Sequence, residues 1–133
     1  MPTSPSGSLC PYPYMGGELH PLKYGGYRND KAGLFQVMDA EERFIAATAR
    51  GCDRRTWVDL YETRLDRTAV ARLVGHLERI RPHTRKLCLV GCTPRTRRQI
   101  RAGTRRLGPA WADSVRFFDD PEEAKKWLIG ELA

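Results

Sequence analysis

The chain of 133 residues lacks the segments that would place it in or across a membrane. It contains no apolar run close to the roughly 20 residues that a membrane-spanning helix needs, so we expect no membrane span. Its N-terminus has no basic segment followed by an apolar stretch, so no signal peptide is predicted. Apolar residues make up 41% of the chain and charged residues 29%, which is typical of a globular domain with its own core.

Metal-binding patterns are also missing. The chain has three widely spaced histidines and no C-x-x-C pair, so no zinc site is predicted, and we expect no cofactor. We assign His76 to a helix face and His83 to a loop, without a function for either. The four cysteines are interpreted as reduced thiols of a cytoplasmic protein: Cys10, Cys52, Cys88 and Cys92.

Acidic residues are absent from one long stretch. Between Arg79 and Trp111 there are ten Lys/Arg and no Asp/Glu. The whole chain has 23 Lys/Arg and 16 Asp/Glu, so the rest of it carries 13 basic and 16 acidic residues, a net charge of −3, while the total is +7. A region that holds all the excess positive charge can attract phosphates, nucleic acid, acidic proteins or anionic lipids.

The middle of the chain predicts a parallel β-α-β unit. Trp57–Tyr61 is a short apolar run with β-branched and aromatic residues, which indicates a buried strand. Asp66–Ile80 follows as a helix, with Asp66 as its N-cap and apolar residues every three or four positions. Lys86–Val90 ends in four consecutive apolar residues, as expected of a strand covered on both faces. The next helix begins at Thr93, a suitable N-cap.

The flanking segments extend this pattern into an α/β fold with a mixed or mostly parallel sheet of four to five strands flanked by helices. We expect a flexible tail over residues 1–17, which are rich in Pro, Gly and Ser, and a single domain over residues 18–133. Pro21 and the Gly25–Gly26 pair argue against a long central strand near the start of the domain, so an edge strand or hairpin is expected there. The other predicted elements are a helix over 34–50, a basic helix over 94–107, a strand over 114–118 and a helix that begins after Asp120.

Several stretches resemble STAS domains, the anti-sigma-factor-antagonist-like family that includes the SpoIIAA-like branch. They are Val58–Leu60, Leu65–Val70 and Leu87–Arg95, and the ending Phe117–Leu128 is similar to the closing strand and helix of that family. The resemblance covers roughly residues 18–132 and implies the fold class given above. It also implies a non-catalytic role in signalling or regulation, in which the domain binds a protein partner, itself, or a small or anionic ligand.

The resemblance raises the question of a phosphorylation switch. In the signalling branch, a Ser or Thr directly follows the Asp that opens the helix, and a partner kinase phosphorylates it. Here Asp66 is followed by Arg67, so the next residue, Thr68, is the candidate phosphoacceptor. A phosphate there would lie at a helix N-terminus, which favours negative charge. The alternative is that Asp66 is only a cap and Thr68 an early helical residue.

A second hypothesis is enzymatic. Cys92 and Arg98 have the C-x5-R spacing of thiolate phosphatases, in which loop N–H groups and the arginine bind the phosphate. Cys92 would then be the nucleophile, with Asp119 or Asp120 as general acid. The loop has no glycine, however, and Pro94 removes one N–H donor, so a capped helix start explains the same residues.

The helix over residues 94–107 carries the densest positive charge. Arginine forks bind phosphates well, but the helix has no interleaved aromatic residues on which bases would stack. Nucleic-acid binding is therefore an alternative, beside a solvated helix face that pairs with an acidic helix or an acidic partner. The six arginines of the cluster are Arg95, Arg97, Arg98, Arg101, Arg105 and Arg106.

Carboxylates gather at the end of the first strand of the central unit, where open α/β sheets often bind ligands. Asp59 and Glu62 have no nearby His or Cys to complete an acid–base pair, and Asp59 has the alternative of bonding to neighbouring backbone groups. We therefore expect a non-catalytic binding surface rather than an active site. Its predicted residues are Asp66, Arg67, Thr68, Thr93, Arg95, Arg97, Arg98 and Arg101.

Overall fold

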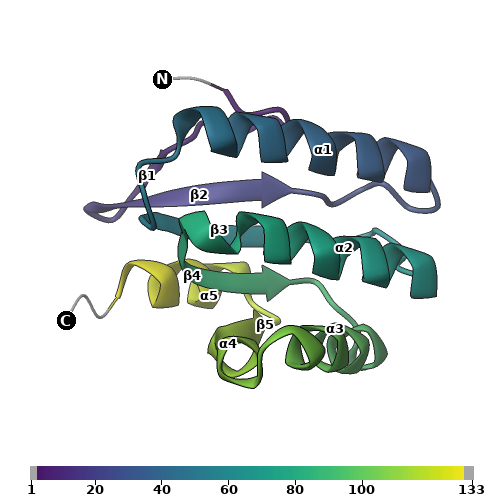
Figure 1. The fold of residues 1–133 in the computed structure, drawn as a ribbon. Coiled ribbons are helices and arrows are strands. Elements are labelled where there is room, and N and C mark those ends of the chain that lie inside the picture. The colour runs from purple at the N-terminus through teal and green to yellow at the C-terminus, as the bar shows by residue number, and fades with distance from the viewer. Residues whose placement is uncertain (1–2, 131–133) are drawn as a thin grey trace.

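A computed structural model describes residues 3–130 of the chain and confirms the α/β class. The helices and strands mostly alternate along the chain, apart from two consecutive strands at its start and two consecutive helices before the last strand (Figure 1). In order they are β1 (Tyr12–Tyr14), β2 (Gly17–Lys23), α1 (Lys31–Thr48), β3 (Arg54–Asp59), α2 (Arg67–Ile80), a 3₁₀ turn (Arg81–His83), β4 (Thr84–Val90), α3 (Pro94–Leu107), α4 (Pro109–Ser114), β5 (Val115–Phe118) and α5 (Pro121–Ile129).

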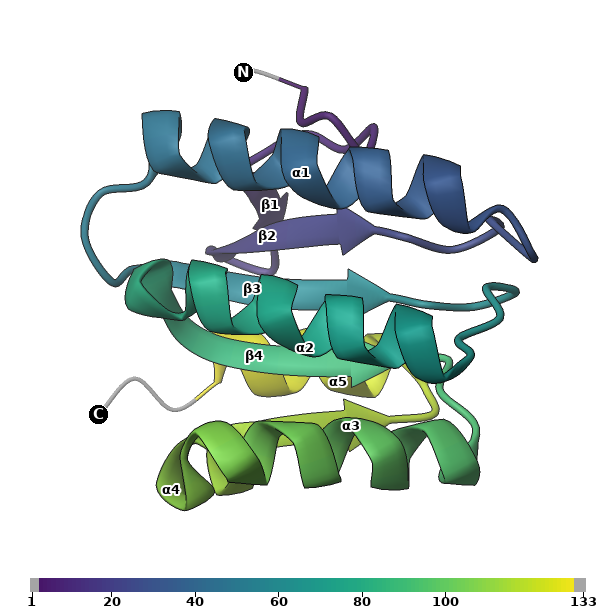
Figure 2. The same ribbon diagram turned by 45° about the vertical axis from the view of Figure 1, so that its right-hand side comes forward.

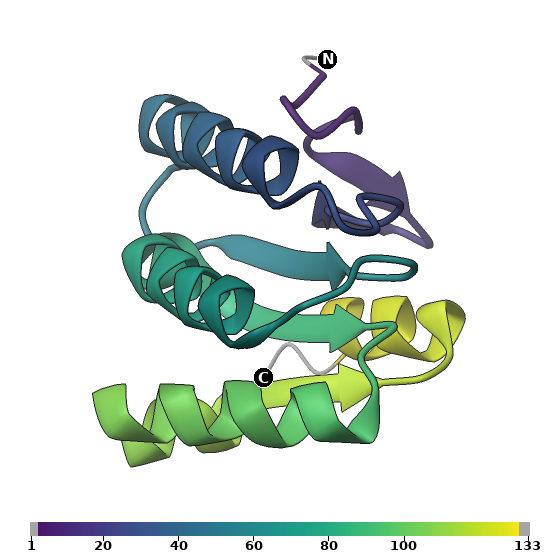
Figure 3. The same cartoon turned by 90° about the vertical axis from the view of Figure 1, so that its right-hand side faces the viewer.

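The five strands form one sheet in the order β1-β2-β3-β4-β5. Strand β1 pairs antiparallel with β2, and the other three pairs are parallel. Because each parallel connection steps to the neighbouring strand in the same direction, right-handed crossovers place the connecting helices on one face. Figures 2 and 3 show α1, α2 and α3 on that face and α5 on the other.

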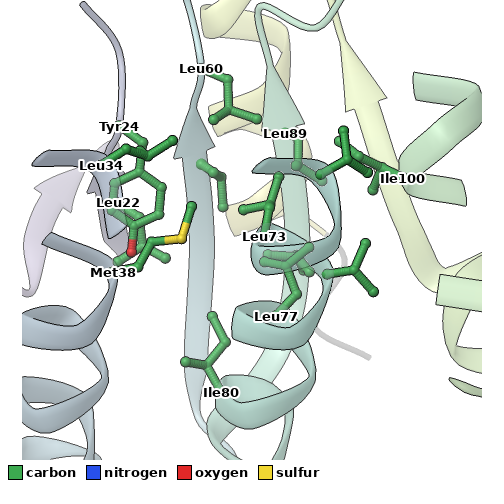
Figure 4. Close-up of a cluster of buried hydrophobic side chains, with 14 of the residues drawn as sticks. Leu22, Tyr24, Leu34, Met38, Leu60, Leu73, Leu77, Ile80, Leu89 and Ile100 are labelled. Carbon is green, nitrogen blue, oxygen red and sulfur yellow. The ribbon is translucent and has the colours of Figure 1, made fainter. Parts of the chain in front are cut away.

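Each face of the sheet has its own buried cluster. On the α1–α3 face, side chains from the helices pack on Leu87 and Leu89 of β4. Figure 4 shows Leu89 beside side chains of this cluster such as Leu73 and Ile100. On the α5 face, Cys88 and Val90 of the same strand pack with Trp57 and Leu128. The uninterrupted apolar run of β4 is therefore covered on both sides, as the sequence predicted.

The predicted helix starts of the central unit are confirmed. Asp66 accepts a hydrogen bond from the Ala69 N–H at 2.9 Å, and Thr93 accepts one from the Thr96 N–H at 3.2 Å. Helix α1 begins three residues earlier than the sequence predicted, because Asp30 caps it through the N–H of Gly33.

Strand β2 agrees only in part with the predicted edge strand or hairpin. It has seven residues and lies between β1 and β3, although it contains Pro21. The register explains this position, because β1 pairs only with the Gly17–Leu19 part of β2. Beyond Leu19, β2 is an edge strand on the side of β1. Pro21 has no backbone N–H, and such a residue is tolerated at an edge.

The tail expected over residues 1–17 also differs from the structure, within the described part that begins at Thr3. Residues 12–14 form β1, and Ser4, Ser8 and Cys10 are buried. The Ser6 N–H and hydroxyl both donate to Glu41 of α1. The segment is therefore packed on the domain from Thr3 onwards.

Candidate functional site

Helices α2 and α3 begin at the same edge of the sheet, because β3 and β4 are adjacent parallel strands (Figure 2). At the start of α2, the Asp66 carboxylate accepts hydrogen bonds from the Ala69 N–H and, at 2.8 Å, from the Lys31 ammonium. The Lys31 hydrogen bond is the main reason that the pKa of Asp66 lies below its usual value. Arg67 and Thr68 are exposed.

The environment of Cys92 does not support a thiolate nucleophile. Its side chain packs against the core on the α1–α3 face, and burial raises the pKa of the thiol to about 12. The guanidinium charge that opposes this rise in the pKa of Cys92 belongs to Arg97 rather than Arg98. A thiol with this pKa is protonated at neutral pH and is a poor nucleophile.

The proposed general acids are engaged in other contacts. Asp119 forms an ion pair with Arg97, and Asp120 caps α5 by accepting a hydrogen bond from the Glu122 N–H at 2.9 Å. Pro94 occupies the first turn of α3, where it adds no donor to the loop. The structure therefore gives the Cys92–Arg98 hypothesis no supporting geometry.

The arginines of α3 fall into two sets. Arg97 and Arg101 turn towards β5 and α4, where both lie over the Phe117 ring and Arg101 donates to the Ala112 carbonyl at 3.1 Å. The other set is exposed and makes no hydrogen bond, ion pair or cation–π contact with the residues that the structure describes. It consists of Arg95, Arg98, Arg105 and Arg106.

A groove of about 700 Å³ runs between α2 and α3. Its floor is made of small and apolar residues, and Arg67 and Arg106 lie at its rim. Leu107, at one end, is 46% exposed. The lining residues are Arg67, Val70, Ala71, Val74, Gly75, Gln99, Ala102, Gly103, Arg106 and Leu107.

The groove is narrow because the two helices approach closely at Gly103. A Cβ atom on Gly103 would lie 2.9 Å from Cγ2 of Val74, closer than two carbon atoms can pack without displacement. This groove was not predicted from the sequence. The pattern that could have indicated it is the recurrence of small residues at facing positions, Ala71 and Gly75 on α2 and Ala102 and Gly103 on α3.

A second hollow, of about 510 Å³, lies at the carboxyl edge of the sheet. Of the predicted site residues only Thr93 lines it, beside Glu62 and Gly91. Asp59 is bonded instead to the backbone, since its carboxylate accepts the Tyr61 N–H at 2.9 Å. The carboxylates of this edge are therefore not assembled into a catalytic pair.

A buried network of side-chain hydrogen bonds was also not predicted from the sequence. His76 is fully buried, with Nε2 2.7 Å from the Tyr24 hydroxyl and Nδ1 2.6 Å from the Glu42 carboxylate. Glu42 in turn accepts from Arg79 at 2.8 Å. Burial lowers the pKa of His76, so the ring is neutral, with its proton on Nδ1 facing the carboxylate.

Residues 3–130 contain neither a cluster of metal ligands nor a helix suited to a membrane. No group of three or more His, Cys, Asp or Glu side chains lies close enough together to hold a metal ion. No helix in this range combines the length and the apolar character needed to cross a membrane.

Comparisons of the chain with protein-family models, with curated proteins and with solved structures gave no match. The resemblance to STAS domains is thus a prediction from the residues themselves.

Proposed function

We propose that the protein is a non-catalytic regulatory domain of the STAS type that binds a partner protein through the groove between α2 and α3. The partner segment would be an amphipathic helix with acidic flanks. Its apolar side chains would enter the groove, and its carboxylates would pair with the arginines at and beside the rim.

The observation that carries this proposal is the combination of an apolar groove with unpaired positive charge. The groove is lined by small and apolar residues such as Val74, Ala102 and Gly103, and Arg67 and Arg106 line it as well. Arg95, Arg98 and Arg105 extend the charge along the exposed side of α3. Arginines that make no internal contact are available to an acidic partner, and such charges raise both specificity and association rate.

The location of the groove also supports a regulatory role. One end of it lies at Arg67, next to Thr68, whose hydroxyl is exposed at the start of α2. Thr68 stays a candidate phosphoacceptor, since a phosphate would add about two negative charges at this end and repel an acidic partner. Mass spectrometry of protein purified from its own cells tests this, and absence of phosphate on Thr68 would remove the switch.

The two alternatives have less support. Nucleic-acid binding would use the same free arginines, but the rings of Phe117 and Trp111 already stack against Arg101 and Arg81, which leaves less aromatic surface for base stacking. A cysteine phosphatase would need a thiolate at Cys92, which burial disfavours.

A substitution in the groove floor tests the proposal. Ala71 is an exposed residue on α2, so Ala71→Glu keeps a good helix former while placing a negative charge in the groove. The probe is a fluorescently labelled synthetic helix with leucines on one face and glutamates on its flanks. We expect the wild-type protein to bind it and Ala71→Glu to bind at least about tenfold more weakly, as measured by fluorescence anisotropy.

Ala46→Glu is the matched control, because Ala46 is an exposed residue of α1, away from the groove lining. It introduces the same charge and should leave the affinity close to that of the wild type. Affinity should also fall as salt concentration rises. Equal weakening by both variants, or equal binding of a peptide with lysines in place of the glutamates, would contradict the proposal.

A further inference from the structure

A second pocket, of about 710 Å³, lies at the opposite edge of the sheet, where β3 begins. It is enclosed by the N-terminal segment, β2, the end of α1 and the loop before β3. Its lining residues are Cys10, Pro11, Glu18, His20, Ala47, Thr48, Ala49, Arg50, Asp53 and Arg54. None of them belongs to the α2–α3 groove.

Arg54 is the unusual residue of this pocket. It is only 3% exposed, and its Nη2 has no hydrogen-bond partner. Its side chain hydrogen-bonds to the Cys10 sulfur, but among the residues that the structure describes no carboxylate forms an ion pair with it. An arginine stays charged inside a protein, and a buried charge without a partner is strongly unfavourable. A binding site explains such an arrangement, because a ligand then supplies the missing partner.

The neighbouring acids do not supply it. Glu41 is buried nearby, and its charge acts on Cys10 together with that of Arg54. Its Oε2 accepts from Ser6, and its Oε1 is buried without a partner, but neither oxygen forms an ion pair with Arg54. Glu18 and Asp53 line the pocket where it meets an adjacent hollow of about 500 Å³. Both acids therefore lie on the side of the pocket that meets this hollow, its mouth, and neither forms an ion pair with Arg54.

The other groups of the pocket fit a small ligand with polar ends. His20 accepts the Arg55 N–H through Nδ1 at 3.0 Å, so the neutral ring has a donor at Nε2. Burial is the main reason that the pKa of His20 falls to about 4, which keeps the ring neutral at physiological pH. Pro11 and Ala47 provide apolar walls.

We infer that this pocket binds a small molecule with a single anionic head group, a carboxylate or a phosphate, which pairs with the Arg54 fork. The acids at the mouth would accept hydrogen bonds from an amine or hydroxyl group at the other end of the ligand. They would also repel polyanions, which excludes nucleic acid as the occupant. The inference is independent of the proposed groove.

The test uses the full-length protein, unfolded and refolded by dialysis to remove any bound ligand. Thermal unfolding is measured with acetate, γ-aminobutyrate or inorganic phosphate at millimolar concentration, against sodium chloride of the same ionic strength. We expect at least one probe to raise the unfolding midpoint of the wild type by mass action. We expect no such rise in Arg54→Met, which removes the guanidinium but keeps an unbranched side chain.

The unfolding midpoints of the ligand-free proteins provide an independent test of the inference. If Arg54 is kept for a ligand, Arg54→Met relieves an unpaired buried charge and should leave the midpoint unchanged or raise it. If Arg54 has a structural role, the same variant lowers the midpoint or fails to fold, and the inference is overturned. Arg43→Met, an exposed position on α1, is the control for loss of one arginine.

A third variant tests the geometry of recognition. Arg54→Lys keeps the charge and loses the planar fork, so it should weaken probe binding by about tenfold while the protein stays folded. A wild-type protein that responds to none of the three probes would overturn the inference. So would a probe-induced rise of the midpoint that persists in Arg54→Met.

Discussion

The buried hydrogen bonds that link Tyr24, His76 and Glu42 connect three separate parts of the fold. Tyr24 follows β2, Glu42 lies on α1 and His76 lies on α2. The carboxylate fixes the proton on Nδ1 of His76, which leaves Nε2 to accept the Tyr24 hydroxyl. Each polar atom of the buried imidazole thus has a partner.

Removal of the Tyr24 hydroxyl should therefore be costly. Tyr24→Phe leaves Nε2 of His76 buried without a partner, and we expect a loss of about 1–3 kcal/mol in the free energy of unfolding, measured in urea. The matched control is Tyr12→Phe, since Tyr12 is 38% exposed and should change stability by less than about 0.5 kcal/mol. Similar effects of the two substitutions would show that the hydrogen bonds of His76 contribute little to the free energy of unfolding.

Single residues were predicted unevenly from the sequence. The caps Asp66 and Thr93 were recognised because their partners lie three residues along the chain. The environments of His76 and Arg54 were not, because burial depends on segments distant in sequence. The raised pKa of Cys92 was not predicted for the same reason, because the core that buries its thiol comes from other elements.

At the scale of elements, the contact between α2 and α3 depends on Gly103. Alanine is more favourable than glycine inside a helix by up to about 1 kcal/mol. Here the added Cβ would meet Val74, a stiff β-branched residue that is itself buried. The local preference for alanine and the tertiary packing thus oppose each other.

A double-mutant cycle separates these two effects. We expect Gly103→Ala alone to destabilise the protein by about 1 kcal/mol through overpacking. In a Val74→Ala background, where the opposing methyl groups are gone, the same change should stabilise it by about 0.5–1 kcal/mol. Urea unfolding of the four proteins checks this, and an identical effect in both backgrounds would contradict the close contact.

The elements themselves were predicted well where hydrophobic periodicity and caps agree. Helices α2, α3 and α5 and strand β4 follow directly from such patterns. The short helix α4 was missed, because Gly108 and Pro109 indicate a stop, although proline also suits the first turn of a new helix. The start of α1 was missed because Gly33 stands where a helix-forming residue is expected.

At the scale of the whole molecule, the arginine cluster of α3, which is one continuous positive region in the sequence, divides into two sets with different surroundings. Arg97 and Arg101 serve the packing of α3 on β5 and α4, while the remaining arginines face outward beside the groove. The sequence located the positive region but not this division, because it depends on where Phe117 and Asp119 lie. The packing of residues 3–17 was unpredictable for a similar reason, since Ser6 meets Glu41 only in the folded chain.

The most direct test of the proposed function is a two-dimensional ¹H–¹⁵N NMR titration of the protein with the acidic amphipathic helix. We predict shifts concentrated on the facing parts of α2 and α3, from Arg67 to Gly75 and from Arg98 to Leu107, and little change around Arg54. Shifts confined to the other edge of the sheet, or no shifts at all, would contradict binding in the groove.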